Sequence, residues 1–219
     1  MMRRKFDEEL NKLNLDLTKM GHLVETALEN TIDAFKNQDK NLAREIITND
    51  RLINDMERNV ESRSFRLILQ QQPIAADLRN VTAALKVVTD LERIGDQAAD
   101  IAEIILNLEG EHIYRTVEHI PAMAKKTREM VRLAITAFIQ KDLESAKEVK
   151  IMDDMIDGLF EEVKQEVMEI IRENHEQIDY CIDFLMIAKY FERIGDHAVN
   201  ICEWLEYHQQ GTVNDHRLI

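Results

Sequence analysis

A thirteen-residue acidic segment occurs twice in this chain, at residues 91–103 as LERIGDQAADIAE and at residues 191–203 as FERIGDHAVNICE. Eight of the thirteen positions are identical, at a constant offset of 100. Self-similarity at a fixed period indicates two structural units of the same kind. Most of the identical polar positions are carboxylates, so the repeat constrains the chemistry of the chain as well as its fold.

Apolar residues recur at steps of three and four over long stretches, which is the period of amphipathic helices. Gln, Asn, Asp or Pro separate these stretches, and Pro73 is expected in the first turn of the third helix. Asp39 and Asp142 are expected to cap the second and fifth helices. The pattern predicts six helices, at about 6–36, 40–71, 73–110, 121–140, 143–174 and 177–209, with a connector at 111–118.

The two halves also match outside the acidic segment. An Ala-Phe pair at position 34 and aspartates at positions 39 and 50 recur at an offset of 103. Short connections make neighbouring helices antiparallel. We therefore predict an all-α fold of two tandem pseudo-symmetric three-helix bundles, with six long antiparallel helices. The expected units are residues 1–112 and 113–210, followed by a frayed tail at 211–219.

Composition excludes several classes of function. The net charge is −14, with 28 basic against 42 acidic residues, which argues against nucleic-acid binding and favours cations or a basic protein partner. No apolar run of about 18 residues predicts a transmembrane helix, and the N-terminus lacks the apolar region of a secretory signal, so we expect a cytoplasmic protein. Cys181 and Cys202 fall on one predicted helix, about 31 Å apart, and cannot form a disulfide with each other.

The repeated segments place a stripe of oxygen-bearing side chains along one face of each helix. The candidate metal ligands on these stripes are Glu92, Asp96, Asp100, Glu192, Asp196 and Asn200, with Glu103 and Glu203 further along. A second pair of stripes lies on the preceding helices and consists of Asp50, Asn54, Asp153 and Asp157. In an antiparallel bundle the start of the second helix lies near the later part of the third. Each unit would thus form an oxygen-rich patch from two helices.

A carboxylate stripe can also be simply the solvated face of an amphipathic helix. Like charges four residues apart destabilise a helix by a few tenths of a kcal/mol, no lysine is interleaved, and the same step occurs in both units. These observations favour a metal site, and hard oxygen ligands select Mg²⁺, Ca²⁺, Mn²⁺ or Fe³⁺ over a thiolate-type zinc site. A third alternative is a metal-free adaptor whose acidic stripes bind a basic protein surface.

Each segment also carries a glycine in mid-helix, where it costs about 1 kcal/mol relative to alanine. A close helix approach, or backbone access beside the ligands, would explain Gly95 and Gly195. The adjacent arginines, at positions 93 and 193, are expected to form structural salt bridges with acids on a neighbouring helix, with anion binding as the alternative. His197 lies about 100° from the stripe and is a weak candidate ligand.

The acidic segments, together with QQPIAADLR at 71–79, resemble the PhoU family of accessory and regulatory proteins of bacterial phosphate-specific transport systems. The resemblance covers nearly the whole chain. It implies two three-helix bundles and E/DxxxD motifs that bind metal clusters, of iron, zinc, manganese, magnesium or another ion. The matching motifs are Glu92–Asp96, Glu192–Asp196 and the supporting Asp153–Asp157, whereas Asn54 and Asn200 depart from the acidic pattern.

The same resemblance implies a function that is not enzymatic. Members are thought to link the ATPase subunit of the phosphate ABC transporter to a sensor histidine kinase, and to keep the phosphate-starvation response off. It also implies a homodimer that reaches the membrane only through its partners. The rival from another class is a carboxylate-bridged metalloenzyme, an oxidase or phosphohydrolase, which would need an open coordination position and a defined base.

Overall fold

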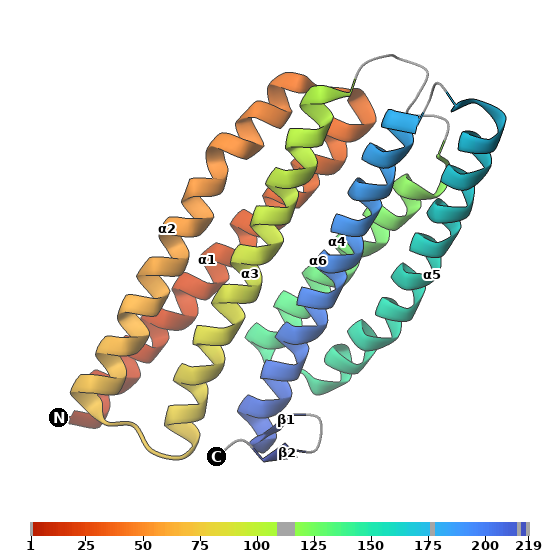
Figure 1. The fold of residues 1–219 in the computed structure, drawn as a ribbon. Coiled ribbons are helices and arrows are strands. Elements are labelled where there is room, and N and C mark those ends of the chain that lie inside the picture. The colour runs from red at the N-terminus through yellow and green to blue at the C-terminus, as the bar shows by residue number, and fades with distance from the viewer. Residues whose placement is uncertain (1, 109–116, 176–177, 214–215, 218–219) are drawn as a thin grey trace.

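The computed structural model describes residues 2–108, 117–175, 178–213 and 216–217. Within them, six helices form an elongated bundle (Figure 1). The helices are α1 (Met2–Asn37), α2 (Lys40–Gln71), α3 (Ala76–Asn107), α4 (His119–Gln140), α5 (Leu143–Glu173) and α6 (Ile178–Gln210). The prediction of an all-α fold with six long helices is therefore confirmed. No helix of the described residues has the length and apolarity that crossing a membrane would require.

The bundle is built from two units of three helices. α1, α2 and α3 contact one another, as do α4, α5 and α6. The units meet through α3 against α6 and α1 against α4, and Figure 1 shows α3 and α6 side by side in the middle, with α2 and α5 on the outer sides. The helices that carry the two acidic segments are thus also the helices that join the two halves.

The core follows from the apolar period of each helix. In α1, the side chains of Leu13, Met20, Val24 and Leu28 are fully buried and step by seven or four residues. In α3 and α6, Ile94 and Ile194 are buried on the side of the helix away from the acidic stripe. The buried residues of both halves form one continuous apolar cluster, so the two units share a core.

The helix starts at Asp39 and Asp142 are as predicted. The carboxylate of Asp39 accepts hydrogen bonds from the backbone N–H groups of residues 41 and 42, and that of Asp142 accepts from residues 144 and 145. These caps satisfy backbone donors that have no partner inside the helix. Both lie at an offset of 103, as the internal repeat requires.

The position predicted for Pro73 is wrong. Pro73 lies in the connection between α2 and α3, and α3 begins only at Ala76. Gln72 and Ala75 have positive φ angles, of 46° and 48°, which turn the chain on both sides of the proline. A helix cannot continue through such residues, so α3 starts after them.

The ends of the other elements differ from the predictions by a few residues. α1 begins at Met2 rather than near residue 6, and α4 begins at His119, two residues before Pro121. The third helix ends at Asn107 rather than near residue 110. Most of the predicted connector at 111–118 lies outside the described residues. Both cysteines are free and buried, as expected.

The prediction of a frayed tail is wrong for the described part of residues 211–219. Two short strands, β1 (Thr212–Val213) and β2 (His216–Arg217), pair antiparallel after α6. Gly211 has a φ of +79° and its N–H donates to the carbonyl oxygen of Tyr207 at 2.8 Å. This glycine ends α6 and turns the chain into β1, which is a common role for glycine after a helix.

Candidate functional site

The repeated glycine in each acidic segment marks the closest approach of two helices. A methyl group added at Gly95 of α3 would lie 2.8 Å from Cδ1 of Ile53 and 3.5 Å from Oδ1 of Asp50, both on α2. Only glycine fits such an approach without displacing the neighbouring side chains. This confirms a close helix approach as the explanation of Gly95, and it places the Asp50 carboxylate against the acidic face of α3.

The second half repeats this arrangement. A methyl group added at Gly195 of α6 would lie 3.2 Å from Oδ1 of Asp153 and 3.4 Å from Cδ1 of Ile156, both on α5. The first cluster is defined here as Asp50, Asn54, Glu57, Glu92 and Asp96, and the second cluster as Asp153, Asp157, Glu192 and Asp196. In each cluster, carboxylates from two antiparallel helices face each other across a glycine.

The first cluster contains buried oxygens without donors. The Asn54 amide donates to Oδ2 of Asp50 at 2.8 Å. Oδ1 of Asp50 and Oδ1 of Asn54 are buried, and neither accepts a hydrogen bond from any described residue. A buried oxygen without a partner is costly, and a cation or a water molecule would remove that cost.

The carboxylates of the first cluster also resist ionisation. Burial, followed by the charges of Asp96 and Glu57, raises the pKa of Glu92 to about 7. Burial and the charge of Asp96 raise the pKa of Asp50 as well. Like charges held close together in a partly desolvated place disfavour the charged form. A bound cation would reverse this effect and favour the charged carboxylates.

Two basic residues partly compensate the clusters. Arg93 forms ion pairs with Glu92 at 3.4 Å and with Asp96 at 3.3 Å, all on α3. The expected salt bridge of Arg93 therefore exists, but it lies on its own helix instead of a neighbouring one. In the second half, Lys189 pairs with Glu192, three residues further along α6. Lys189 precedes the second acidic segment and is not interleaved with its carboxylates, so it adds a positive charge from outside the stripe.

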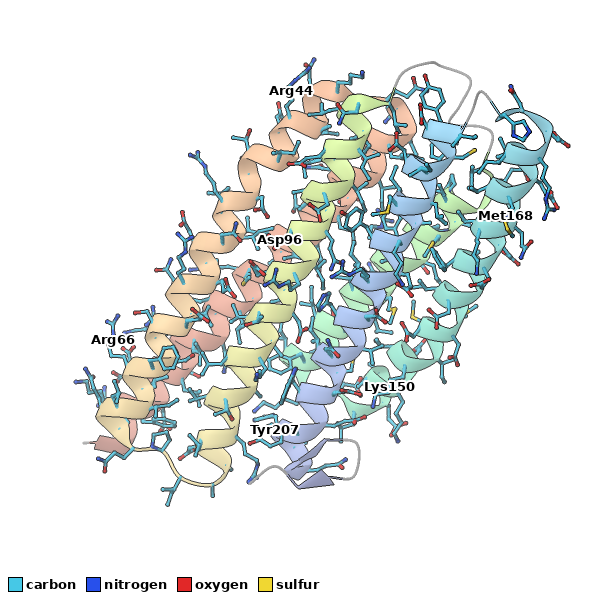
Figure 2. The ribbon with its side chains drawn as sticks, viewed as in Figure 1. Arg44, Arg66, Asp96, Lys150, Met168 and Tyr207 are labelled. Carbon is cyan, nitrogen blue, oxygen red and sulfur yellow. The ribbon has the colours of Figure 1, made fainter. Side chains whose placement is uncertain are left out.

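The second cluster has the same electrostatic character. Burial, followed by the charges of Asp157 and Asp196, raises the pKa of Asp153 to about 6. Burial and the charge of Glu192 raise the pKa of Asp196. Asp196 is exposed, whereas its counterpart Asp96 is half-buried near the middle of α3 (Figure 2). The second cluster is therefore the more open of the two.

Asp100 and Asn200 have partners at the junction of the two halves instead. The Asn200 amide donates to Oδ1 of Asp90 at 3.1 Å, from α6 to α3. In the opposite direction, the Tyr190 hydroxyl of α6 hydrogen-bonds the Asp100 carboxylate of α3. Asp100 is still close enough to Asp50 for its charge to raise the pKa of that carboxyl. The geometry thus brings Asp100 near the first cluster and turns Asn200 away from the second.

His197 also belongs to this junction. Its Nδ1 atom lies 2.9 Å from Oδ1 of Asp90, the oxygen that accepts from Asn200. Of the last acids on each stripe, Glu103 is exposed and Glu203 is half-buried. The structure therefore gives His197 a structural partner across the halves.

Sequence reasoning missed Glu57. This residue lies three positions after Asn54 on α2, and its charge contributes to the raised pKa of Glu92. At the equivalent place in the second half, Phe160 lies 5.3 Å from the Lys189 ammonium in a cation–π contact. The first half thus has Asn54 and Glu57 where the second has Asp157 and Phe160. The acid has moved by about one helical turn, which i,i+3 spacing could have revealed.

The donor set suits a hard cation, but the ligands are not closed around one. Among residues 2–108, 117–175, 178–213 and 216–217, no three His, Cys, Asp or Glu side chains are arranged to hold a metal ion. Carboxylates repel one another without a cation between them, so an open arrangement is expected for the protein alone. Metal ligation by the ten candidate residues stays a prediction, supported by the unsatisfied oxygens and the raised pKa values.

Comparison with known proteins gives a consistent result. The family model described as "PhoU domain" matches twice, at residues 17–105 and 120–205. A phosphate-specific transport system accessory protein PhoU homolog of Clostridium acetobutylicum is 39% identical over 93% of both chains. A homolog of the same description from Thermotoga maritima is 33% identical over 94% of this chain and 89% of its own length.

Solved structures agree in fold. The crystal structure of PhoU from Pseudomonas aeruginosa superposes with a TM-score of 0.88 at 33% identity, covering 94% of this chain and all of that one. The phosphate transport system regulatory protein PhoU from Streptococcus pneumoniae gives a TM-score of 0.86 at 29% identity, covering 96% and 99% of the two chains. Two matches to the family model, close relatives over nearly the full length and the same fold together show that this chain belongs to the PhoU family.

Proposed function

We propose that this chain is a negative regulator of phosphate uptake and of phosphate-starvation signalling. It acts as a metal-binding cytoplasmic adaptor between the ATPase subunit of the phosphate ABC transporter and a sensor histidine kinase. Its curated relatives are named as accessory proteins of the phosphate-specific transport system, which supports a role beside the transporter. The absence of turnover is part of the proposal.

The observation that carries the metal-binding part is the pair of carboxylate clusters. Asp50 and Asp153 each lie against the glycine of the facing helix, with Asp96 and Asp196 close enough to raise their pKa values. Iron, zinc, manganese or magnesium held there would supply the positive charge that these acids lack. The four aspartates and the adjacent Glu92 and Glu192 would hold it, with Asp157, Asn54 and Asp100 at the edge.

The adaptor part has support on the outer surface. Phe65 and Leu69 on α2 are 55% and 78% exposed, and Arg58 and Arg66 lie beside them around a shallow hollow. Glu61 also lines the hollow, so its rim carries both signs of charge, and an apolar strip with a charged rim suits contact with another protein. Such a surface would serve either a partner protein or the second copy of an expected homodimer. Light scattering of the purified chain measures whether it is a monomer or a dimer without partners.

A deletion strain complemented by variants tests the proposed function. The wild-type gene is expected to repress phosphate-starvation genes in high phosphate, and the double variant Asp96→Asn with Asp196→Asn is expected to leave them derepressed. Asp33→Asn, which removes one exposed charge of α1 far from both clusters in sequence, serves as the control and should repress normally. Normal repression by the double variant would refute the metal-dependent part of the proposal.

Partner capture and assays of turnover separate the adaptor from an enzyme. Purified wild-type protein is expected to retain both the transporter ATPase and the kinase from a lysate in high phosphate. Elemental analysis of protein purified without added metal identifies the bound ion. Hydrolysis of a phosphate ester, or consumption of O₂, by the metal-loaded protein would instead favour the metalloenzyme and contradict the adaptor.

A further inference from the structure

A cavity of about 60 Å³ with both polar and apolar walls, the latter from Leu17, Phe138 and Ile139, lies at the end of the bundle that carries the β1–β2 hairpin, where the two halves meet. α1 contributes Asn14, α3 contributes Asn80, and α6 contributes His208, while Lys141 lies just beyond the end of α4. One water molecule needs roughly 10–15 Å³ of such space, so the cavity has room for a few waters or one small anion.

Two basic side chains line this cavity, and a third lies near it. Lys141 and His208 line it, and the charges of Lys141 and Arg79 both act on His208. Arg79 packs against the backbone of Gly211, whose added methyl group would lie 3.7 Å from Nε of Arg79. The α6 terminus and its turn therefore hold the arginine in place at the edge of the cavity.

These basic groups lack negative partners. The Nε atom of Arg79 is buried and donates to no described acceptor. Within the described ranges, no carboxylate forms an ion pair with Arg79 or Lys141. A chain with 42 acidic and 28 basic residues has ample carboxylates to neutralise them. Because its pKa is lowered to about 4, His208 is neutral near pH 7, and the cations here are Lys141 and Arg79. Cations beside a cavity without carboxylates indicate a place for an external anion.

The internal symmetry shows that the fold does not require this basic cluster. The offsets of 103 and 100 relate Lys141 to Gln38, Arg79 to Asp179 and His208 to Leu108. Lys141 and Gln38 have the same left-handed backbone, with φ of 59° and 54°, so the turn itself does not demand a lysine. The basic residues are a property of one site and not of the repeat.

We propose that this cavity binds a small tetrahedral oxyanion of the phosphate and sulfate class, held by Arg79, Lys141, His208 and the amides of Asn14 and Asn80. Arginine and lysine donate charge-assisted hydrogen bonds to such oxygens, and the asparagine amides add neutral donors. The site is separate from the two carboxylate clusters and would exist whether or not these hold a metal. It would give the chain a direct means to respond to the anion.

Isothermal titration of the purified chain with inorganic phosphate, at constant ionic strength, tests the proposal. Wild-type protein is expected to bind, and Lys141→Gln should weaken binding about tenfold, because a charge-assisted hydrogen bond is lost. Gln38 shows that glutamine adopts this backbone, so the variant should fold. Lys36→Gln, which removes an equal charge from the exposed end of α1, should bind as wild type. Equal affinity for sulfate and phosphate would define a general oxyanion site. Weaker binding of sulfate would define a site selective for phosphate.

A second measurement tests the proposal on the wild-type protein, so that it does not depend on the stability of the variants. The imidazole resonances of His208 are expected to shift on addition of phosphate, with its pKa moving upward because the bound anion favours the imidazolium. Arg79→Gln should reduce this shift. The melting curve of the variant, compared with that of the wild type, shows whether the variant is folded. No heat with either anion in the wild type, unchanged His208 resonances, or equal affinity of wild type and Lys141→Gln would each overturn the proposal. None of these outcomes bears on the adaptor role tested in the deletion strain.

Discussion

The Nδ1 atom of His197 lies 2.9 Å from Oδ1 of Asp90, and this contact joins the second half of the chain to the first. Asp90 is 8% exposed and also accepts from Asn200. In the opposite direction, Tyr190 hydrogen-bonds Asp100. Positions 90 and 190 are equivalent in the two units, and each contacts a polar residue of the other unit. Reciprocal contacts of this kind are typical of an interface with two-fold symmetry.

This junction predicts a measurable coupling. Asp90→Ala should lower the free energy of unfolding by about 1–3 kcal/mol, because two donors lose a buried acceptor. A double-mutant cycle with His197→Ala should give a coupling of about 1 kcal/mol or more, read from denaturant unfolding. The control is the exposed pair Glu29–Arg128, which also joins the halves, at 2.9 Å, and should couple by less than about 0.5 kcal/mol. Equal coupling of both pairs would contradict the buried role of Asp90.

The carboxylate clusters predict opposite effects of one variant with and without metal. Without metal, Asp96→Asn with Asp196→Asn should raise the melting temperature, because it removes like-charge repulsion of a few tenths of a kcal/mol to about 1 kcal/mol. With added metal, the wild type should gain stability and the variant should not. Differential scanning fluorimetry after chelation, and then with each metal, measures both effects. An equal gain in the variant would show that the ions bind elsewhere.

The surroundings of three glycines predict the order in which their replacement by alanine changes the free energy of unfolding. Gly95→Ala should destabilise by about 1 kcal/mol, since overpacking against buried Ile53 outweighs the helix preference of alanine. Gly195→Ala should change the stability by less than about 0.5 kcal/mol, because its nearest neighbours lie at 3.2 and 3.4 Å. Gly158 on α5 has no neighbour within 4 Å, so Gly158→Ala should stabilise by about 0.5–1 kcal/mol. Guanidinium unfolding of the three variants checks the order, and a stabilising Gly95→Ala would refute the close approach.

His208 predicts a loss of stability in acid. Burial, followed by the charges of Lys141 and Arg79, lowers its pKa to about 4, with Asn14 as a neutral neighbour from α1. The unfolded chain binds this proton near pH 6.5 and the folded chain only near pH 4. Stability from this group is therefore complete above pH 6.5 and falls as the pH drops to 4, by up to about 3 kcal/mol. His208→Gln should flatten this part of the profile when unfolding is measured without oxyanions in the buffer.

The contribution of other groups cancels in the comparison of wild type and variant. The carboxyl of Glu92, with a pKa raised to about 7, acts in the opposite direction, since protonation relieves it as the pH falls. The difference between the two profiles isolates His208. A constant difference from pH 7 to pH 4 would mean that the histidine is not desolvated.

The helices, the caps and the facing of α2 and α3 could be predicted because local signals encode them. The apolar period fixes each helix, Asp39 and Asp142 mark two starts, and a mid-helix glycine such as Gly95 marks a close approach. The same reasoning misplaced Pro73, because the positive φ angles on both sides of it depend on how α2 and α3 pack. Local pattern alone does not contain that information.

The partners of Asp90, Asp100 and Asn200 could not be predicted for a related reason. Periodicity shows which face of a helix is polar, but not which polar residues of two separate units will meet when the units dock. Strict correspondence between the halves does not predict Glu57, because the acid of the first half lies one turn away from the position equivalent to Asp157. Contacts that depend on docking, or on divergence between the repeats, require the three-dimensional structure.

The pseudo-symmetric junction of α3 and α6 has a further consequence. In a dimer of identical chains, any substitution would alter both copies at once. Here the two copies are covalently joined, so each could change alone, and Asn54 and Glu57 of the first unit differ in this way from Asp157 and Phe160 of the second. The same freedom allowed Lys141 and His208 of the second unit, and Arg79 of the first, to differ from their counterparts. Covalent joining of the two units thus lets an internally duplicated protein give its two equivalent halves different tasks.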